Sequence, residues 1–180
     1  MPPVVDLRST SGTRTRRHRR TGRRHGGVDK GEPTRQVEFE AMLLSRHGHL
    51  FGSRGRSADR HLERSAYTLL SRIQLDGPMS IGELHEAFGL DTSTLNRQTA
   101  AMMRAGLADR IPDPEGGIAR KFRITERGEK RLNDDRARCL SVLEGLLDDW
   151  DPEEVVRFAS SLQRLNRSIE SLDGRPWPRP

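Results

Sequence analysis

The segment from residue 80 to residue 125 constrains the fold of this chain more than any other part of the sequence. Ser80 and Glu83 have the spacing of a capping box, in which each side chain accepts a backbone hydrogen bond at the start of a helix. Gly89 can end that short helix, and Asp91 is a suitable N-cap for a second one. The order of these residues predicts two helices joined by a three-residue turn.

The residues that follow have the pattern of a β-hairpin. The second helix ends near Gly106, after which Leu107–Ile111 and Arg120–Ile124 can form two strands. In the second strand, apolar Phe122 and Ile124 alternate with basic residues, the period of a half-buried strand with a basic outer face. Proline and glycine residues between the strands favour a turn. Together the parts predict a winged helix-turn-helix.

Amphipathic helices are predicted on both sides of this segment. Apolar residues at helical spacing predict one helix from Val37 to Phe51 and another from Leu62 to Ile73 that stops at Gly77-Pro78. Thr125 can cap a long helix over residues 126–150, and Asp151-Pro152-Glu153-Glu154 is typical of the start of a last helix that continues to Leu172. The predicted fold class is mainly α with a small β-hairpin wing.

Charge and composition divide the chain into three regions. Residues 1–35 carry 10 Lys or Arg against 3 Asp or Glu, and the rest of the chain is close to neutral. We expect a disordered Arg-rich tail at 1–35, because this segment has almost no apolar residues to bury. Residues 36–173 would form the winged helix-turn-helix domain with its dimerisation helices, its winged core at about 61–125. Residues 174–180 would be a Pro-rich tail.

The cellular compartment follows from two further features. The single cysteine, Cys139, excludes an intramolecular disulfide and suits a reducing compartment. No apolar run approaches the roughly 18 residues of a membrane span. A cytoplasmic protein with no membrane partner is expected.

The start of the second helix carries the residues that point to DNA. Leu95, Met102 and Met103 would be buried, which leaves the opposite face exposed. The polar residues predicted to bind DNA there are Thr92, Ser93, Thr94, Asn96, Arg97 and Gln98. Hydroxyls, amides and a guanidinium suit base edges and phosphates in the major groove, and the positive end of the helix dipole favours a phosphate. The alternative reading of each single residue is an ordinary solvated helix surface.

Local charge agrees with this interpretation. Residues 97–131 carry 9 Lys or Arg against 5 Asp or Glu, so a basic zone lies within a nearly neutral body. Such a zone is typical of a surface that faces DNA. On the wing, Arg120 and Lys121 are predicted to contact the DNA backbone.

Four short motifs resemble those of the multiple-antibiotic-resistance regulator (MarR) family. They are Ile81-Gly82-Glu83-Leu84, Thr94-Leu95-Asn96-Arg97, Ala105-Gly106-Leu107-Ala108-Asp109-Arg110 and Ile124-Thr125-Glu126-Arg127-Gly128. The resemblance covers roughly residues 37–172. It implies a homodimeric transcription factor, usually a repressor, whose first helix and last two helices form the dimer interface.

The wing departs from the family pattern. Family wings commonly carry an Asp and an Arg two residues apart, at the places that correspond to Gly116 and Ile118 here. Arg120 and Lys121 could supply the missing contact, and an acidic residue of the hairpin, Asp113 or Glu115, could pair with Arg110.

Two partners besides double-stranded DNA are expected. The last two helices carry more large apolar residues than a small winged domain can cover, so a two-fold homodimer on a pseudo-palindromic operator is predicted. The resemblance also implies a small aromatic or anionic effector between the dimer region and the winged domain, with candidate walls at residues 39–51 and 67–73. The alternative to dimerisation is that these helices pack only within the chain.

Neither catalysis nor cofactor or metal binding is predicted. The sequence contains no convincing nucleophile–base pair, and one cysteine with scattered histidines does not give the spacing of a zinc site. Cys139, on an apolar helix face, is interpreted as a buried thiol. Two other functions stay open: a protein-interaction module on a winged scaffold, and a nonspecific nucleic-acid-binding protein that acts through its Arg-rich tail.

Overall fold

The computed structural model describes residues 30–48 and 62–179. The chain divides into two units, residues 1–39 and residues 40–180, and the first helix, α1 (Gly31–Arg46), spans the division. The predicted tail therefore needs a correction at its end, because residues 31–35 are helical. An ion pair between Glu32 and Arg35, 2.9 Å long and one helical turn apart, lies in that first turn. The Arg-rich segment before it and the predicted break at 52–57 fall outside the described residues.

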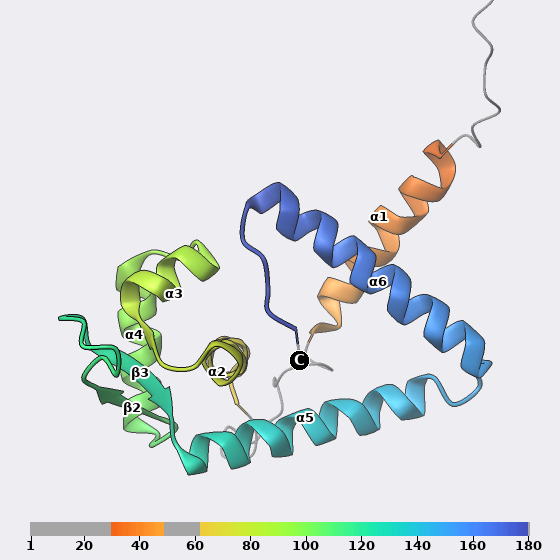
Figure 1. The fold of residues 1–180 in the computed structure, drawn as a ribbon. Coiled ribbons are helices and arrows are strands. Elements are labelled where there is room, and N and C mark those ends of the chain that lie inside the picture. The colour runs from red at the N-terminus through yellow and green to blue at the C-terminus, as the bar shows by residue number, and fades with distance from the viewer. Residues whose placement is uncertain (1–29, 49–61, 180) are drawn as a thin grey trace, which may run out of the picture. The chain divides into compact units, whose positions relative to one another are not determined.

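The second unit contains all the elements that follow. In chain order they are α2 (Arg64–Asp76), β1 (Met79–Ser80), α3 (Ile81–Phe88), α4 (Thr92–Arg104), β2 (Ala108–Ile111), β3 (Lys121–Ile124), α5 (Glu126–Leu146) and α6 (Pro152–Asp173). The strands form an antiparallel sheet in the order β1-β3-β2. Figure 1 shows β2 and β3 of this sheet beside α4. The predicted class, mainly α with a small β-hairpin wing, is confirmed. No described helix is both long and apolar enough to cross a membrane.

The hydrophobic core joins α2, α3, α4, the sheet and the start of α5. Its fully buried side chains include Leu69 and Leu70 of α2, Leu84 of α3, Leu95 of α4 and Leu132 of α5. Each lies on the apolar stripe of its helix, so helical periodicity was sufficient to predict it. Burying such side chains contributes roughly 1.5–3 kcal/mol each. This core fixes α4 relative to the hairpin.

The predicted signals at the turn between α3 and α4 are mostly confirmed. The capping box of Ser80 and Glu83 is complete, and Gly89 ends α3 with φ of 63° in the left-handed region. Asp91 is the N-cap of α4, but its side chain makes no capping hydrogen bond. One predicted core residue is wrong: Met103 is 40% exposed, and Thr99, whose hydroxyl donates to the Leu95 carbonyl at 2.8 Å, is buried instead.

Both long helices begin where the sequence predicts. The Thr125 hydroxyl accepts the Gly128 N–H at 3.0 Å and caps α5, while Asp151 and Glu154 form the capping box of α6. Helix α5 ends at Leu146, four residues before the predicted end. The two-residue strand β1 was not predicted, because Met79 and Ser80 alone are too short for a strand pattern; they pair with Phe122 and Lys121 of β3.

Candidate nucleic-acid interface

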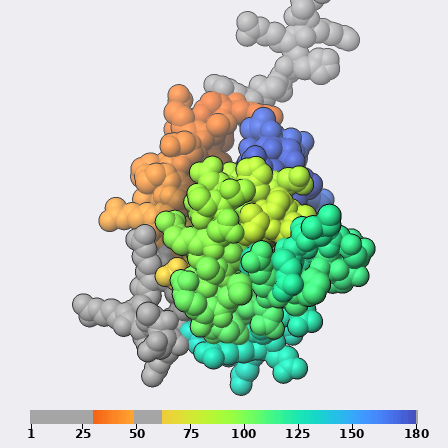
Figure 2. All heavy atoms as spheres, turned by 90° about the vertical axis from the view of Figure 1, so that its left-hand side faces the viewer, coloured from red at the N-terminus to blue at the C-terminus, as the bar shows by residue number. Residues whose placement is uncertain are grey.

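The first turns of α4 present a polar surface. Burial of Leu95, Thr99 and Met102 turns one side of the helix into the core, so the residues on the opposite side face outward. Thr92, Ser93, Asn96 and Arg97 are exposed, whereas Thr94 and Gln98 are half-buried. In the space-filling view, α4 and the hairpin occupy the same face of the molecule (Figure 2). The arrangement leaves the helix start open for a groove.

The two wing residues that were predicted to contact the DNA backbone, Arg120 and Lys121, differ in exposure. Arg120 is exposed and donates from Nη2 to the Arg110 carbonyl at 3.3 Å. Lys121, the first residue of β3, is 8% exposed and therefore buried. Its Nζ lies 3.1 Å from Glu83 Oε1, 3.4 Å from Asp113 Oδ1 and 4.0 Å from Glu115 Oε2. We call these four residues the Lys121 cluster.

The Lys121 cluster changes the protonation equilibria of its members. The hydrogen bond to Glu83 is the main reason that the pKa of Lys121 is raised, and Asp113 adds to it. Burial alone would raise the pKa of the Glu83 carboxyl, but the Ser80 backbone and hydroxyl together with the Lys121 ammonium bring that pKa below its ordinary value. The same carboxylate therefore caps α3 and holds the wing.

The sequence interpretation of the wing needs correcting in two respects. Lys121 is occupied by carboxylates of its own chain, so we remove it from the candidate DNA contacts. Asp113 and Glu115 pair with Lys121 rather than with Arg110, whose guanidinium carbon lies 6.0 Å from the centre of the Phe122 ring. The alternating pattern of β3 predicted a basic outer face, but the Lys121 side chain is enclosed by Glu83 of α3 and by Asp113 and Glu115 of the hairpin loop. No local sequence pattern indicates that these residues meet.

A cavity of about 640 Å³ lies beside α4. Its apolar walls include Leu62, Ala66, Met102 and Leu107. Four basic residues (Arg97, Arg127, Lys130 and Arg131) and two acidic ones (Glu63 and Asp134) also line it. No residue of the predicted wall at 67–73 does. This cavity was not predicted, because its lining comes from the ends of three helices.

Gln98 belongs to this cavity more than to the groove. Its Oε1 atom is shielded from solvent and has no hydrogen-bond partner among the described residues. A buried amide oxygen without a donor is costly and marks a place where a ligand or water can bind. Arg97 both lines the cavity and lies on the exposed face of α4. The predicted reading residues are thus divided between two surfaces.

Other predicted site types can be compared with the structure briefly. Over residues 30–48 and 62–179, no group of three or more His, Cys, Asp or Glu could hold a metal ion. Cys139 is half-buried on α5. The sequence also did not indicate the polar contacts of residues 174–179 after α6, described below.

The two crossed helices, the exposed start of α4 and the adjoining hairpin define a winged helix-turn-helix protein. Residues 62–116 match the MarR family. The HTH-type transcriptional regulator YxaD of Bacillus subtilis (strain 168), itself uncharacterised, is 36% identical over 138 residues, which cover 76% of this chain and 95% of that protein. The chain belongs to the MarR family, which is a family of transcriptional regulators rather than of enzymes.

Solved structures share the fold at lower identity. A MarR family protein from Bacillus stearothermophilus has a TM-score of 0.62 at 22% identity, covering 77% of this chain and 93% of its own. A mutant MarR from E. coli complexed with operator DNA has a TM-score of 0.57 at 15% identity, covering 77% of this chain and 99% of its own. These likenesses show the winged fold, and the residue-level interface rests on the geometry described above.

Proposed function

We propose that this regulator binds a pseudo-palindromic operator as a homodimer and reads each half-site with the start of α4. The observation that carries the proposal is the outward face of α4, where Ser93, Asn96 and Arg97 are exposed while Leu95 and Thr99 anchor the other side. Arg can pair with guanine and Asn with adenine in the major groove. Thr92 and Thr94 complete the candidate set, with Arg120 on the DNA backbone, while Gln98 is assigned to the cavity.

The proposal is tested by comparing two arginines on the genomic sites that the protein recovers by pull-down and sequencing. Arg97→Ala should lose roughly 1–3 kcal/mol of specific binding and relax the preference at one base pair. Arg157→Ala is a matched control, because Arg157 is exposed on α6 and pairs with Glu153 at 3.3 Å. Fluorescence anisotropy on operator and random DNA measures both. Equal losses on the two DNAs for Arg97→Ala would contradict a reading role.

Arg120 is proposed to act differently from Arg97. It is exposed on the hairpin, where a guanidinium can meet a phosphate without reading a base. Arg120→Ala should weaken operator and random DNA alike and flatten the salt dependence of binding. The same titrations test the contribution of the Arg-rich tail to DNA binding. Deleting residues 1–29 removes the tail and leaves α1 whole. Loss of all binding on deletion would favour the nonspecific alternative.

Dimerisation is proposed from the exposed apolar side chains of the last two helices. Large apolar residues that are at least 39% exposed there are Leu140, Val142 and Leu146 of α5, and Val156, Phe158, Leu162, Leu165, Ile169 and Leu172 of α6. Soluble monomers rarely expose so much contiguous apolar surface, and a second copy is the partner that would bury it symmetrically. Phe158→Glu should give a monomer by light scattering, whereas Glu153→Gln should not. A wild-type protein that is monomeric at micromolar concentration would exclude the dimer.

We also propose that the cavity beside α4 takes a small aromatic anion. Its apolar walls suit a ring, its excess of basic residues suits a negative charge, and Gln98 Oε1 offers an acceptor for a ligand hydroxyl or N–H. An anion bound there would attract the Arg97 guanidinium, which the groove also needs. Binding would therefore lower operator affinity, because the ligand and the DNA favour different positions of one side chain.

Benzoate and benzyl alcohol provide a matched pair of probes for the cavity. Benzoate should raise the melting temperature of the wild type and weaken its operator binding, and benzyl alcohol should do neither. Lys130→Gln, which neutralises one basic wall residue, should reduce the benzoate shift, whereas Arg157→Gln should not. Identical shifts in wild type and Lys130→Gln would place benzoate elsewhere.

A further inference from the structure

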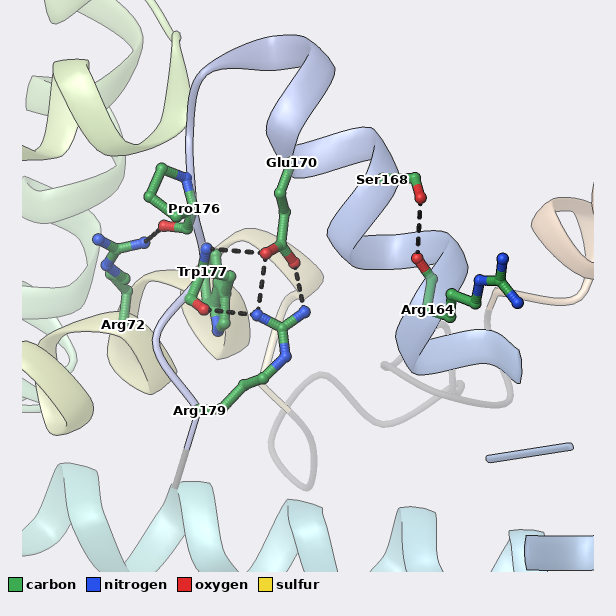
Figure 3. A network of polar contacts seen from close by, with 7 residues as sticks. All are labelled: Arg72, Arg164, Ser168, Glu170, Pro176, Trp177 and Arg179. Carbon is green, nitrogen blue, oxygen red and sulfur yellow. Dashed lines mark hydrogen bonds and ion pairs between the residues drawn. The ribbon is translucent and has the colours of Figure 1, made fainter. Parts of the chain in front are cut away.

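The chain does not end freely after α6. Residues Gly174–Arg179, which we call the C-terminal strap, run from the end of α6 to the surface formed by α2 and α3 (Figure 3). The sequence predicted only an extended Pro-rich tail here. The contacts of the strap are specific enough to define a binding site on the DNA-reading part of the molecule.

The centre of that site is the side chain of Trp177. Its ring meets Phe88 of α3 edge to face, with centroids 5.5 Å apart and planes at 81°. The guanidinium carbon of Arg72, from α2, lies 5.1 Å from the centre of the same ring. Aromatic pairs and cation–π contacts of this geometry are both attractive. Trp177 is therefore held by two helices of the winged domain.

Arg72 is held in position by a residue of its own helix. Its Nε lies 2.5 Å from Asp76 Oδ2, one helical turn along α2, and its side chain is only 13% exposed. From that position Nη1 donates to the Pro176 carbonyl at 3.1 Å. One fixed guanidinium thus recognises both the backbone of residue 176 and the ring of residue 177.

Glu170 shapes the strap from the other side. Its carbonyl accepts the N–H of Arg175 at 3.1 Å, which turns the chain back after Gly174, whose φ is 66°. Its carboxylate accepts the backbone N–H of Trp177 at 3.3 Å. The same carboxylate binds the Arg179 guanidinium through both oxygens, at 2.9 and 2.6 Å. The hydrogen bonds from Arg179 are the main cause of the lowered pKa of Glu170. The strap is therefore folded onto the last turn of α6 (Figure 3).

The strap also reaches the turn that positions α4. A Cβ added to Gly89 would lie 2.6 Å from the guanidinium carbon of Arg175, so the two groups are in close contact. Gly89 ends α3 in the left-handed conformation and begins the connection to Asp91. A displacement of the strap would therefore change the contacts of Gly89, close to the start of α4, the helix that we propose reads DNA.

From these contacts we propose that the surface of Arg72, Phe88 and Gly89 is a binding site for the chain's own Pro-Trp-Pro strap, and that this latch fixes the winged domain to the end of α6. Without the strap, α6 is linked to the winged domain through α5 alone along the chain. With the strap bound, the linkage closes into a ring. In the dimer the latch would set the distance between the two α4 helices, a consequence that rests on the proposed function.

The latch is testable by spectroscopy without any DNA. The chain has two tryptophans, so Trp150→Phe in the full-length protein makes Trp177 the only emitter and keeps an aromatic ring beside Phe158. Trp177 should emit at shorter wavelength than free tryptophan amide and be protected from iodide. Arg179→Ala and Glu170→Gln should each shift the emission to the red and increase quenching severalfold, whereas Glu153→Gln should change neither.

A charge exchange gives a second, independent reading. Glu170→Arg alone should release Trp177, and combining it with Arg179→Glu should restore part of the protection, since the ion pair forms again in reverse while the hydrogen bond from the Trp177 backbone N–H stays lost. Circular dichroism checks that every variant keeps its helices. Trp177 quenched in the wild type as fast as tryptophan amide would overturn the latch. So would an absence of rescue in a double variant that is folded.

The effect on DNA is measured with operators in which the half-site separation varies by single base pairs. The wild type should prefer one separation, and Trp177→Ala should bind the same half-sites with that preference reduced severalfold. A Trp177→Ala preference equal to wild type would overturn the spacing role while leaving the operator function intact. Loss of operator binding by the wild type itself would reject the proposed function, and the fluorescence results would still decide whether the strap binds.

Discussion

The winged domain is attached to the last two helices at two places that are built in opposite ways. The start of α5 is part of the core: Leu132 is fully buried, and the buried Asp135 carboxylate accepts the Leu62 N–H at 2.6 Å. The strap is attached by polar and aromatic contacts that stay partly open to solvent, with Glu170 and Arg179 side chains 19% and 28% exposed. One attachment is buried in the core, and the other is half-buried and charged.

The difference indicates a division of roles between the two attachments. Removing apolar surface from water accounts for most folding stability, so the α5 attachment cannot open without disrupting the domain. Partly exposed ion pairs and single aromatic contacts contribute modestly, and solvent can compete for them. The strap can therefore open while the domain stays folded. Substitutions at the first place should change stability, and substitutions at the second should change geometry.

Leu132→Ala should give the largest effect, at the α5 attachment. Deleting a fully buried Leu removes apolar contacts and leaves a cavity, which costs about 2–5 kcal/mol. Ile118→Ala, in the loop between β2 and β3, is the control: Ile118 is fully exposed and lies outside the proposed dimer surface, so the change should stay within about 0.5 kcal/mol. Urea unfolding followed by circular dichroism measures both. Similar losses for the two variants would remove the contrast between the attachments.

A pair of glycines on α5 sharpens the same contrast. A Cβ on Gly128 would collide with the Leu107 backbone carbonyl, because the helix start lies directly against the end of the α4–β2 connection. Gly128→Ala should therefore destabilise by roughly 1–3 kcal/mol. A Cβ on Gly145 would meet nothing within 4 Å, so Gly145→Ala should stabilise by about 0.5–1 kcal/mol. We expect the two substitutions to change the free energy of unfolding in denaturant with opposite signs. Changes of the same sign would mean that α5 does not lie against Leu107.

The structure of a region can be predicted from the sequence when its contacts join residues that are close together in the chain. The caps at Ser80, Thr125 and Asp151 depend on residues at most three apart, and the apolar stripes depend on one helical turn, so both are legible in sequence. The Lys121 cluster combines residues 83, 113, 115 and 121 across three elements. No local pattern encodes that combination. The strap is the extreme case, since its Trp177 meets residues 72 and 88 about one hundred positions earlier.

Lys121→Met tests whether the Lys121 cluster contributes mainly to stability, as the α5 attachment does, or mainly to geometry, as the strap does. The substitution keeps most of the volume and removes the charge that Glu83, Asp113 and Glu115 share. The hairpin should remain folded on Phe122 but lose its fixed position, and affinity for all DNA should fall by less than about fivefold. Arg120→Met is the control, because it removes an exposed cation without touching the cluster. A larger loss of affinity for Lys121→Met than for Arg120→Met, with a reduced salt slope, would return Lys121 to the DNA contacts.

Acid should open the strap before it opens the core. The hydrogen bonds from Arg179 and from the Trp177 backbone N–H, with the positive charge of nearby Arg167, lower the pKa of Glu170, so the bound strap holds the carboxyl in its ionised form. Because the pKa is lower in the bound state, the contribution of Glu170 is complete above the ordinary Glu pKa of about 4.3 and disappears as the pH falls through the lowered value. The other charged pair facing the strap is Arg72 with Asp76.

The measurement is iodide quenching of Trp177 in the Trp150→Phe protein between pH 7 and 3. Quenching should stay constant down to about pH 5 and then rise below about pH 4, before circular dichroism reports loss of helix. In Glu170→Gln it should be high at every pH, because the group that titrates is absent. Should both signals change together in the wild type, the strap and the core would open as one unit, and the contrast between the two attachments would not hold.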